Sequence, residues 1–163
     1  MFKVMPIAKM LALLVGVAAL CSCASPSYEG YKCAPYVVKG KRYTPLAPRQ
    51  AIGFKEEGIA SHYDESFLLI FPGKTAIGEK QWRWSRGAAH KTLPLPSRVR
   101  ITNLENGRKV TVRVNDRGPY VAGRIIDVTP PIAKALDFHK KGLARVRVEV
   151  LSVGDGKHRI KSR

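Results

Sequence analysis

Residues 109–120 of this chain read KVTVRVNDRGPY, and this stretch decides the fold class. Its three valines alternate with polar residues, which is the period of two expected for a strand with one buried face. The alternation stops before Asp116, and the Gly118-Pro119 pair then forces a turn. We therefore expect a strand that ends by bringing Asp116 to a rim of the folded domain.

Further short strands are expected on both sides of this stretch, over residues 99–104, 124–129 and 143–151. Glu105-Asn106-Gly107 is a typical hairpin turn between the first of these strands and residues 110–114. Residues 131–136 are expected to form one or two helical turns, with Pro131 at the favoured first position. Short strands with so little helix predict a mainly β fold, closed into a barrel because closure removes exposed strand edges.

The regions outside this barrel differ from it in composition. Four prolines in residues 24–57 exclude long helices there, although residues 36–43 read as a small hairpin turning at Lys39-Gly40. The last twelve residues, 152–163, are polar and basic, and we expect them to be disordered. The expected organisation is a signal at 1–22, a tether at 23–57, a barrel at 58–151 and a basic tail at 152–163.

Residues 1–22 have the pattern of a bacterial lipoprotein signal peptide. Two lysines precede an apolar run over residues 10–21, which is too short for a bilayer span of about 20 residues. Leu20 lies three places before Cys23, and the small residue Ser22 lies directly before it. We expect Cys23 to become the lipid-bearing first residue of the mature chain. The alternative is an ordinary cleaved signal or a short hydrophobic anchor.

The residue after Cys23 bears on location. Ala24 stands where inner-membrane retention usually requires an aspartate. We therefore expect the mature chain to be lipid-anchored in the cell envelope and to face the periplasm, with the outer membrane favoured over the inner membrane. Stable anchoring requires two lipid signals, which the diacylglycerol and N-acyl chains of a bacterial lipoprotein supply.

The chain is strongly basic, with a formal net charge of +17 over 163 residues. In the cytoplasm this charge would indicate nucleic acid, but the lipoprotein signal argues against such a partner. Cys33 is the only thiol left after processing, so an internal disulfide is excluded. The charge therefore favours anionic partners in the envelope: lipid head groups, lipopolysaccharide or cell-wall carboxylates.

Three local clusters could carry chemistry. In the first, Arg117 can hold the neighbouring Asp116 carboxylate in place or lower its pKa, although Asp116 could also be a simple turn cap. The second is AHKTLPLP at residues 89–96, where His90 is a candidate but a lone histidine is usually a structural hydrogen-bonding group. The third is the turn Thr75–Glu79, which presents one carboxylate. We find no metal-ligand spacing, no serine-histidine-aspartate arrangement and no phosphate loop, and we expect no cofactor.

Taken together, these segments resemble the rare lipoprotein A (RlpA) family, whose domain is a six-stranded double-psi β-barrel related to expansins. The resemblance runs from about Tyr36 to Leu151, and its most specific parts are AHKTLPLPS and RVNDRGPY in this order. Further matching stretches are Gly58–Tyr63, Thr75–Glu79, Val99–Gly107, Arg124–Asp127 and Ala144–Leu151.

The resemblance implies peptidoglycan chemistry. Some family members are lytic transglycosylases, which cut the bond between N-acetylmuramic acid and N-acetylglucosamine, prefer peptide-poor strands and leave 1,6-anhydro ends. Carried over by position, the expected catalytic residues are Asp116, Glu79 and His90. The residues expected to bind substrate are Tyr63, Arg117 and Tyr120.

The chemistry requires a neutral carboxylic acid that protonates the departing oxygen as an oxocarbenium-like centre develops. The muramic 6-hydroxyl then attacks in place of water, so no carboxylate nucleophile is needed. Asp116 is the first candidate for the acid, provided that burial under substrate raises its pKa. Glu79 is the alternative, and the sequence does not decide between them.

The chain departs from the family pattern at two positions of the expected site. His62 replaces the usual tryptophan, and Ile77 replaces the usual asparagine, while the chain between Tyr63 and Glu79 is about three residues longer and contains the apolar run 67–71. These changes support an alternative function, a catalytically inactive barrel that binds glycan or an envelope or division protein. We expect no C-terminal glycan-binding domain of the sporulation-related type.

A third hypothesis is attachment to the envelope through charge. Five arginines at alternating strand positions are expected to form a basic outer face of the barrel: Arg98, Arg100, Arg113, Arg145 and Arg147. The plain alternative is a solvated face without a partner.

Overall fold

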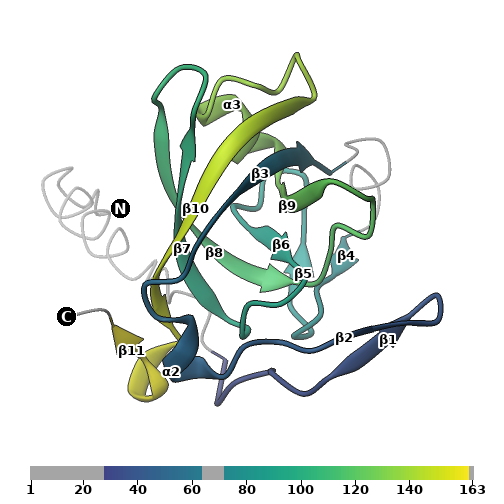
Figure 1. The fold of residues 1–163 in the computed structure, drawn as a ribbon, viewed down its shortest axis with the longest axis vertical. Helices are drawn as coiled ribbons and strands as arrows, with labels where there is room; N and C mark the ends of the chain where they lie inside the picture. Colours follow the sequence, from purple (N-terminus) through teal and green to yellow (C-terminus); the bar gives the residue numbers. More distant parts are fainter. Residues whose placement is uncertain (1–27, 64–71, 162–163) are drawn as a thin grey trace, which may run out of the picture.

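The computed structural model describes residues 28–63 and 72–161 (Figure 1). The expected signal peptide, Cys23 and the apolar run 67–71 lie outside the described residues. Among the helices that the structure describes, none is long and apolar enough to cross a membrane.

One seven-stranded sheet forms the body of the molecule. Its strands, in spatial order, are β11 (Ile160–Lys161), β10 (Leu143–Val153), β3 (Lys55–His62), β9 (Arg124–Val128), β6 (Ala88–His90), β8 (Lys109–Asp116) and β7 (Ser97–Asn103). β10 also pairs with β7, so six strands close into a barrel and β11 extends one end of β10. The pairs β3–β9 and β6–β8 are parallel and the others are antiparallel. The predicted mainly β, six-stranded barrel is confirmed.

The smaller elements surround the barrel. They are the hairpin β1 (Tyr36–Val38) and β2 (Lys41–Tyr43), the pair β4 (Gly73–Lys74) and β5 (Lys80–Gln81), the helices α2 (Pro48–Ala51) and α3 (Pro130–Ala135), and the 3₁₀ turn η2 (Gly156–His158). The predicted hairpin at residues 36–43 is confirmed. Helix α3 begins one residue earlier than expected, because Thr129 has extended backbone angles and Pro130 takes the first helical position.

The barrel core comes from the period-two pattern of the longest strands. In β8, Val112 and Val114 are buried. In β10 the valines at 146, 148 and 150 are buried, whereas the alternating residues Arg145 and Arg147 are exposed. Ile132 and Phe138 close the core from the α3 side. The turn between β7 and β8 is the predicted one, with Gly107 at φ +74° donating its N–H to the Asn103 carbonyl at 2.8 Å.

Two predictions about the flanking regions are wrong. Residues 152–161 are not disordered: β10 continues to Val153, and β11 pairs with it. The described part of the expected tether, residues 28–57, packs on the barrel. Ala51 is fully buried, Lys32 exchanges backbone hydrogen bonds with Leu95 at 2.8 and 3.1 Å, and β3 already begins at Lys55. Polarity and proline content predicted neither result. β11 is fixed by pairing with the end of β10, and residues 28–57 are fixed by contacts with distant parts of the chain such as Leu95.

Candidate active site

Asp116 is the last residue of β8, at the rim where the sequence predicted it. Its Oδ1 accepts hydrogen bonds from the backbone N–H groups of Ala76 and Arg117, each at 2.8 Å. Its Oδ2 accepts a hydrogen bond from the Tyr63 hydroxyl at 3.1 Å. The side chain is half-buried, so three donors fix the carboxylate while solvent still reaches the residue.

Tyr63 stands between two carboxylates. Burial raises the pKa of Tyr63, and the nearby charge of Asp116 adds to the effect, so the phenol stays protonated as the donor to Asp116. The charge of Asp127, on β9, raises the pKa of the same tyrosine. In the sheet, Ala89 of β6 pairs with Asp116 on one side and Asp127 on the other. Neighbouring strands are about 4.8 Å apart, so the backbones of the two aspartates are separated by about 10 Å.

Asp127 is a functional candidate that the sequence reasoning did not select. Burial is the main reason that its pKa is raised, against the opposing hydrogen bond from Ser61 and the charge of Arg124. A raised pKa favours the neutral carboxylic acid. The available sequence signal was an acidic residue interrupting the apolar strand residues Ile125, Ile126 and Val128.

Glu79 lies in the expected turn, but it does not present its carboxylate to open solvent. The turn itself is confirmed, since the Gly78 N–H donates to the Thr75 carbonyl at 2.8 Å. Glu79 Oε2 accepts from Arg113 at 2.6 Å and from Asn115 at 2.8 Å, whereas Oε1 is buried without a partner among the described residues. The same turn therefore contacts two consecutive residues of β8: Ala76 binds Asp116, and Glu79 binds Asn115.

His90 is buried rather than exposed in a cleft, with 1% of its surface accessible. Its Nδ1 accepts from the backbone N–H groups of Thr92 and Leu93, both at 3.2 Å, so the ring proton belongs on Nε2. Nε2 then donates to Glu56 at 3.0 Å. This network is the structural role that the sequence kept open for His90. Among the described residues, the ring binds Glu56, Thr92 and Leu93 rather than Asp116 or Glu79.

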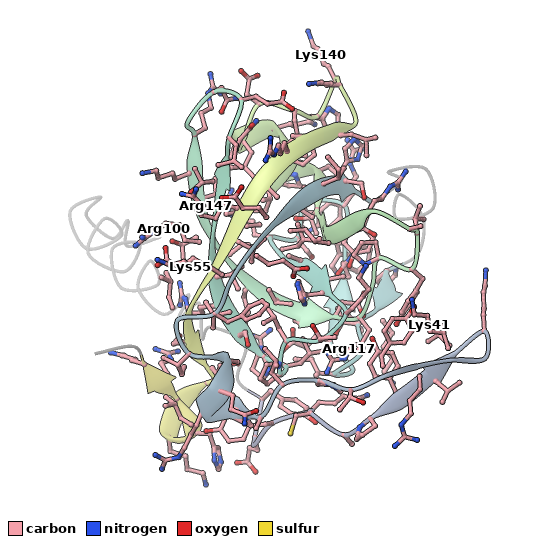
Figure 2. All side chains as sticks on the ribbon, in the orientation of Figure 1. Lys41, Lys55, Arg100, Arg117, Lys140 and Arg147 are labelled. Carbon is pink, nitrogen blue, oxygen red and sulfur yellow. The ribbon has the colours of Figure 1, made fainter. Side chains whose placement is uncertain are left out.

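Arg117 does not form an ion pair with the Asp116 carboxylate among the contacts that the described residues make. Its guanidinium donates to the carbonyls of Leu93 and Lys32 and lies over the Tyr36 ring at 5.2 Å. Only its backbone N–H holds Asp116. Figure 2 shows Arg117 between the barrel and the β1–β2 hairpin. The side chain therefore joins two segments beside the rim, the loop after β6 at Leu93 and the N-terminal segment at Lys32.

Aromatic side chains gather beside this rim. Tyr36 and Tyr43 of the hairpin stack at 5.3 Å, and Tyr120 packs on Tyr43 at 5.5 Å. Tyr43 and Tyr120 line a hollow of about 140 Å³ together with Lys41, Lys91 and residues 119, 121 and 122. Tyr120, which the sequence predicted to bind substrate, therefore lines this hollow. The sequence did not predict that the β1–β2 hairpin contributes Lys41 and Tyr43 to it.

The two departures from the family pattern have structural explanations. His62 directs both ring nitrogens at carbonyl oxygens, those of Tyr63 at 2.9 Å and His139 at 3.1 Å, and stacks on the His139 ring. Ile77 packs against the barrel core. Both residues are thus committed to local packing. Within residues 28–63 and 72–161, no three histidine, cysteine or acidic side chains are grouped as metal ligands would be.

The expected basic outer face is only partly correct. Arg113 is excluded from it, because it is largely buried between Glu79 and Asp155, with a distance of 2.6 Å to each. Arg100 pairs with Glu149, and Arg145 and Arg147 pair with Glu57. Figure 2 shows Lys55, Arg100 and Arg147 together on the barrel side away from Lys41 and Arg117.

Comparisons with known proteins agree with this architecture. The family model described as "Lytic transglycolase" matches residues 55–148. Three proteins called "Endolytic peptidoglycan transglycosylase RlpA" are similar to the chain. The Pseudomonas aeruginosa protein is 46% identical over 76% of this chain and 35% of its own length. The Campylobacter jejuni protein is 44% identical over 80% and 46%, and the Neisseria meningitidis protein 47% over 73% and 48%.

Among solved structures, a Streptomyces papain inhibitor matches with a TM-score of 0.49 and 21% identity, over 61% of this chain and 96% of the inhibitor. The chain spans about a third to a half of the length of the curated relatives named above.

The closed six-stranded barrel with parallel β3–β9 and β6–β8 pairs, and a carboxylate held at its rim, defines a double-psi β-barrel of the lytic transglycosylase class. Within that class, the identity to the curated relatives over about three quarters of the chain is decisive. The chain belongs to the RlpA family.

Proposed function

We propose that this protein is a lytic transglycosylase of peptidoglycan, acting on the bond between N-acetylmuramic acid and N-acetylglucosamine in peptide-poor glycan strands. The observation that carries the proposal is the Asp116 carboxylate, held at the barrel rim by three donors. Membership of a family whose relatives are called endolytic peptidoglycan transglycosylases supports the same activity.

The proposed reaction exchanges one bond at the anomeric carbon for another. The bond from muramyl C1 to the bridging oxygen breaks, and a bond from C1 to the muramyl 6-oxygen forms. The bridging oxygen gains a proton, and the 6-hydroxyl loses one, so water is not consumed. Developing positive charge at C1 is stabilised by a fixed carboxylate, which is the role we propose for Asp116.

Asp127 is the proposed proton donor. Burial raises its pKa, which favours the neutral acid that protonation of the bridging oxygen requires. Its place one strand beyond Ala89 from Asp116 puts the two carboxyl groups on the same row of the sheet. Glu79 and His90 are proposed as positioning residues, because their carboxylate and ring contact Arg113, Asn115 and Glu56.

The tyrosine hollow is the proposed contact surface for sugar rings. Tyr43 and Tyr120 supply aromatic area beside the NDRGPY turn, and this area would replace the stacking surface lost where His62 stands in place of tryptophan. The alternative function, a non-catalytic binder, is favoured by Ile77, whose side chain packs on the core where an amide would bind sugar hydroxyls.

The test of activity is digestion of purified peptide-free glycan strands, followed by mass spectrometry of anhydromuramyl ends. The wild-type chain is expected to release them, and Asp116→Asn to lower the rate at least about 100-fold. Asp137→Asn, an exposed aspartate paired with Arg108 beyond α3, is the matched control with unchanged rate. Equal background release by wild type and Asp116→Asn would leave only the binder.

The donor assignment has a separate test. Asp127→Asn is expected to lower kcat by about 10²–10⁴-fold, as removal of a general acid does, with the fold intact by circular dichroism. A nearly unchanged kcat would contradict Asp127 as the proton donor, and Asp116 would then be the candidate acid.

We also propose that Cys23 carries the lipid anchor and that the barrel faces the periplasm, with the outer membrane as its site. A peptidoglycan substrate supports an envelope location. Mass spectrometry of the N-terminal peptide from membrane-extracted protein tests the anchor: a diacylglyceryl-modified Cys23 is expected, and an unmodified or uncleaved N-terminus would contradict it.

A further inference from the structure

The described chain begins at one end of the barrel. The Tyr28 backbone N–H donates to the Asp155 carboxylate at 3.3 Å, and the Tyr31 hydroxyl donates to the His158 carbonyl. Residues 28–31 therefore pack against η2, next to β11. Figure 1 places β11 at the lower left of the molecule, while β4 and β5, which flank the Thr75–Glu79 turn, lie on the right.

This contact limits how far the barrel can stand from an anchor on Cys23. Tyr28 follows Cys23 by five residues, and a fully extended chain spans at most about 3.6 Å per residue. The end of the barrel at Tyr28 therefore stays within about 18 Å of the anchored residue. The tether is much shorter than the 23–57 segment expected from the sequence.

The same end of the barrel carries unpaired positive charge. Arg98, Arg159 and Lys161 line a hollow of about 380 Å³ with Leu151 and Ser152. Lys157 of η2 is a fourth exposed cation, and these four residues are named here the entry-end cluster: Arg98, Lys157, Arg159 and Lys161. Among the residues that the structure describes, no carboxylate lies within 4.0 Å of their charged groups.

The neighbouring sheet face is different. There, Glu149 pairs with both Lys55 and Arg100, and Glu57 pairs with both Arg145 and Arg147. Residues 28–31 and 152–161 contain two acidic residues, Glu29 and Asp155. Asp155 is buried and paired with Arg113, so Glu29 alone opposes the four cations of the cluster. The uncompensated charge is therefore concentrated at the entry end rather than on the broad arginine face.

We infer that the entry-end cluster is a docking surface for the anionic phospholipid head groups of the membrane that holds the anchor. The inference rests on the proposed lipid on Cys23, which brings the cluster close to the bilayer. Charge attraction is screened over about 8 Å at physiological salt, so a short tether is needed for the cluster to act. Phosphate groups at the surface fit a hollow lined by three cations and a hydroxyl.

Vesicle binding tests the inference with residues 24–163, which include every described element and carry no lipid. Flotation with vesicles of phosphatidylglycerol and phosphatidylcholine is compared with flotation on pure phosphatidylcholine. Binding to the anionic vesicles alone is expected, and it should weaken steeply with salt. Each basic residue at an anionic surface contributes about fivefold, so Arg98→Gln/Arg159→Gln/Lys161→Gln should lose about 100-fold in affinity.

The matched control removes the same charge from the opposite end of the barrel, in Lys109→Gln/Lys140→Gln/Lys141→Gln; Figure 2 labels Lys140 there. This control should lose less than about threefold. Equal losses in both triple variants, or binding to pure phosphatidylcholine, would overturn the inference, as would vesicle binding that free phosphate or glycan strands abolish at low concentration.

Failure of the proposed function is distinguishable from failure of this inference. Anhydromuramyl release by the cluster variant is expected to equal that of the wild type, because the groups that hold Asp116 are Tyr63, Ala76 and the backbone of Arg117, and none of them belongs to the cluster. Wild-type activity with no difference in vesicle binding would overturn the docking surface alone. Vesicle binding without anhydromuramyl release would overturn the enzyme alone.

Discussion

Asp116 illustrates how one side chain depends on residues far from it in sequence. Its donors are its own neighbour Arg117, a turn residue 40 positions earlier and a tyrosine 53 positions earlier. Each donor is a neutral N–H or O–H group, and the adjacent guanidinium is directed elsewhere. The carboxylate is therefore fixed in direction without a direct ion pair, which leaves its charge available to a ligand.

Glu56 gives a prediction about acid stability. The hydrogen bond from His90 is the main reason that the pKa of Glu56 is lowered from 4.5 in the folded protein. The unfolded chain then binds the proton more tightly, so the stabilisation is complete above about pH 5 and is lost as the pH falls through the folded-state pKa. We expect Glu56→Gln to be less stable than wild type at pH 7, with the difference narrowing toward pH 3.

Urea unfolding at several pH values measures this effect. The control is the same measurement in a His90→Gln background. There the Glu56→Gln substitution should no longer change the pH dependence of the free energy of unfolding, because the hydrogen-bond partner is already lost. A stability difference that stays constant from pH 7 to pH 3 would show that the Glu56–His90 pair has no such role.

At this scale, the sequence predicted which residues carry charge at the rim but not which groups bind them. Asp116 and the Thr75–Glu79 turn were located because a strand pattern ends at one and a glycine turn contains the other. Glu56 was not predicted as the partner of His90, which lies 34 positions away. Local periodicity contains no information about such a pair, because only the order of strands in the sheet places β3 and β6 on the two sides of β9.

Arg113 connects three elements of the structure. Its guanidinium binds Glu79 of the turn and Asp155 before η2, and all three side chains are mostly buried. We expect Arg113→Met to lower the free energy of unfolding by about 3–5 kcal/mol, because two carboxylates lose their partner in a poorly solvated place. Arg113→Lys should recover only part, since one ammonium cannot replace the fork geometry.

Chemical denaturation of these variants beside Arg147→Met provides the comparison. Arg147 is exposed and pairs with Glu57, so its loss should cost less than about 1 kcal/mol. Similar losses of unfolding free energy at both positions would contradict the prediction that the buried ion pairs of Arg113 stabilise the fold more than an exposed pair does.

Gly154 determines whether η2 and β11 can lie against residues 28–31. Its φ is +80°, and a Cβ there would lie 2.5 Å from the His158 carbonyl oxygen and 2.6 Å from the Tyr31 ring. Gly30 has nearly the same φ, +84°, but open space around it. We expect Gly30→Ala to cost about 1–2 kcal/mol from backbone strain alone and Gly154→Ala clearly more.

Thermal unfolding of the two glycine variants separates strain from overlap. A larger fall in Tm for Gly154→Ala is expected, and equal falls would mean that η2 and Tyr31 move aside at no cost.

At the scale of elements, the sequence was most informative where a strand and its turn are contiguous. The hairpin at residues 36–43, the β7–β8 turn and β10 were predicted because their patterns are local. The structure of residues 152–161 was not predicted, because β11 forms only by pairing with Ser152 and Val153 of β10. A short polar segment of this kind is indistinguishable from a tail until an edge is available to it.

The whole molecule is larger than its family match. Residues 55–148 contain Asp116 and Asp127 but omit the hairpin, the Lys32–Leu95 pairing and the last five residues of β10. We expect residues 24–163 to unfold in one cooperative transition and residues 55–148 to show none, because the shorter piece loses strand pairing and the buried Ala51. Urea titration followed by circular dichroism decides this, and a cooperative transition of the short piece would contradict it.

The seam between residues 28–32 and the barrel has a mechanical consequence. If the chain is held by its lipid while the glycan mesh holds the rim, tension enters at Tyr28. It meets the Asp155 and His158 contacts and then the paired backbones of Lys32 and Leu95. Under this load the seam would peel from its Tyr28 end before β8 is stretched, because β8 is held by a neighbouring strand on each side.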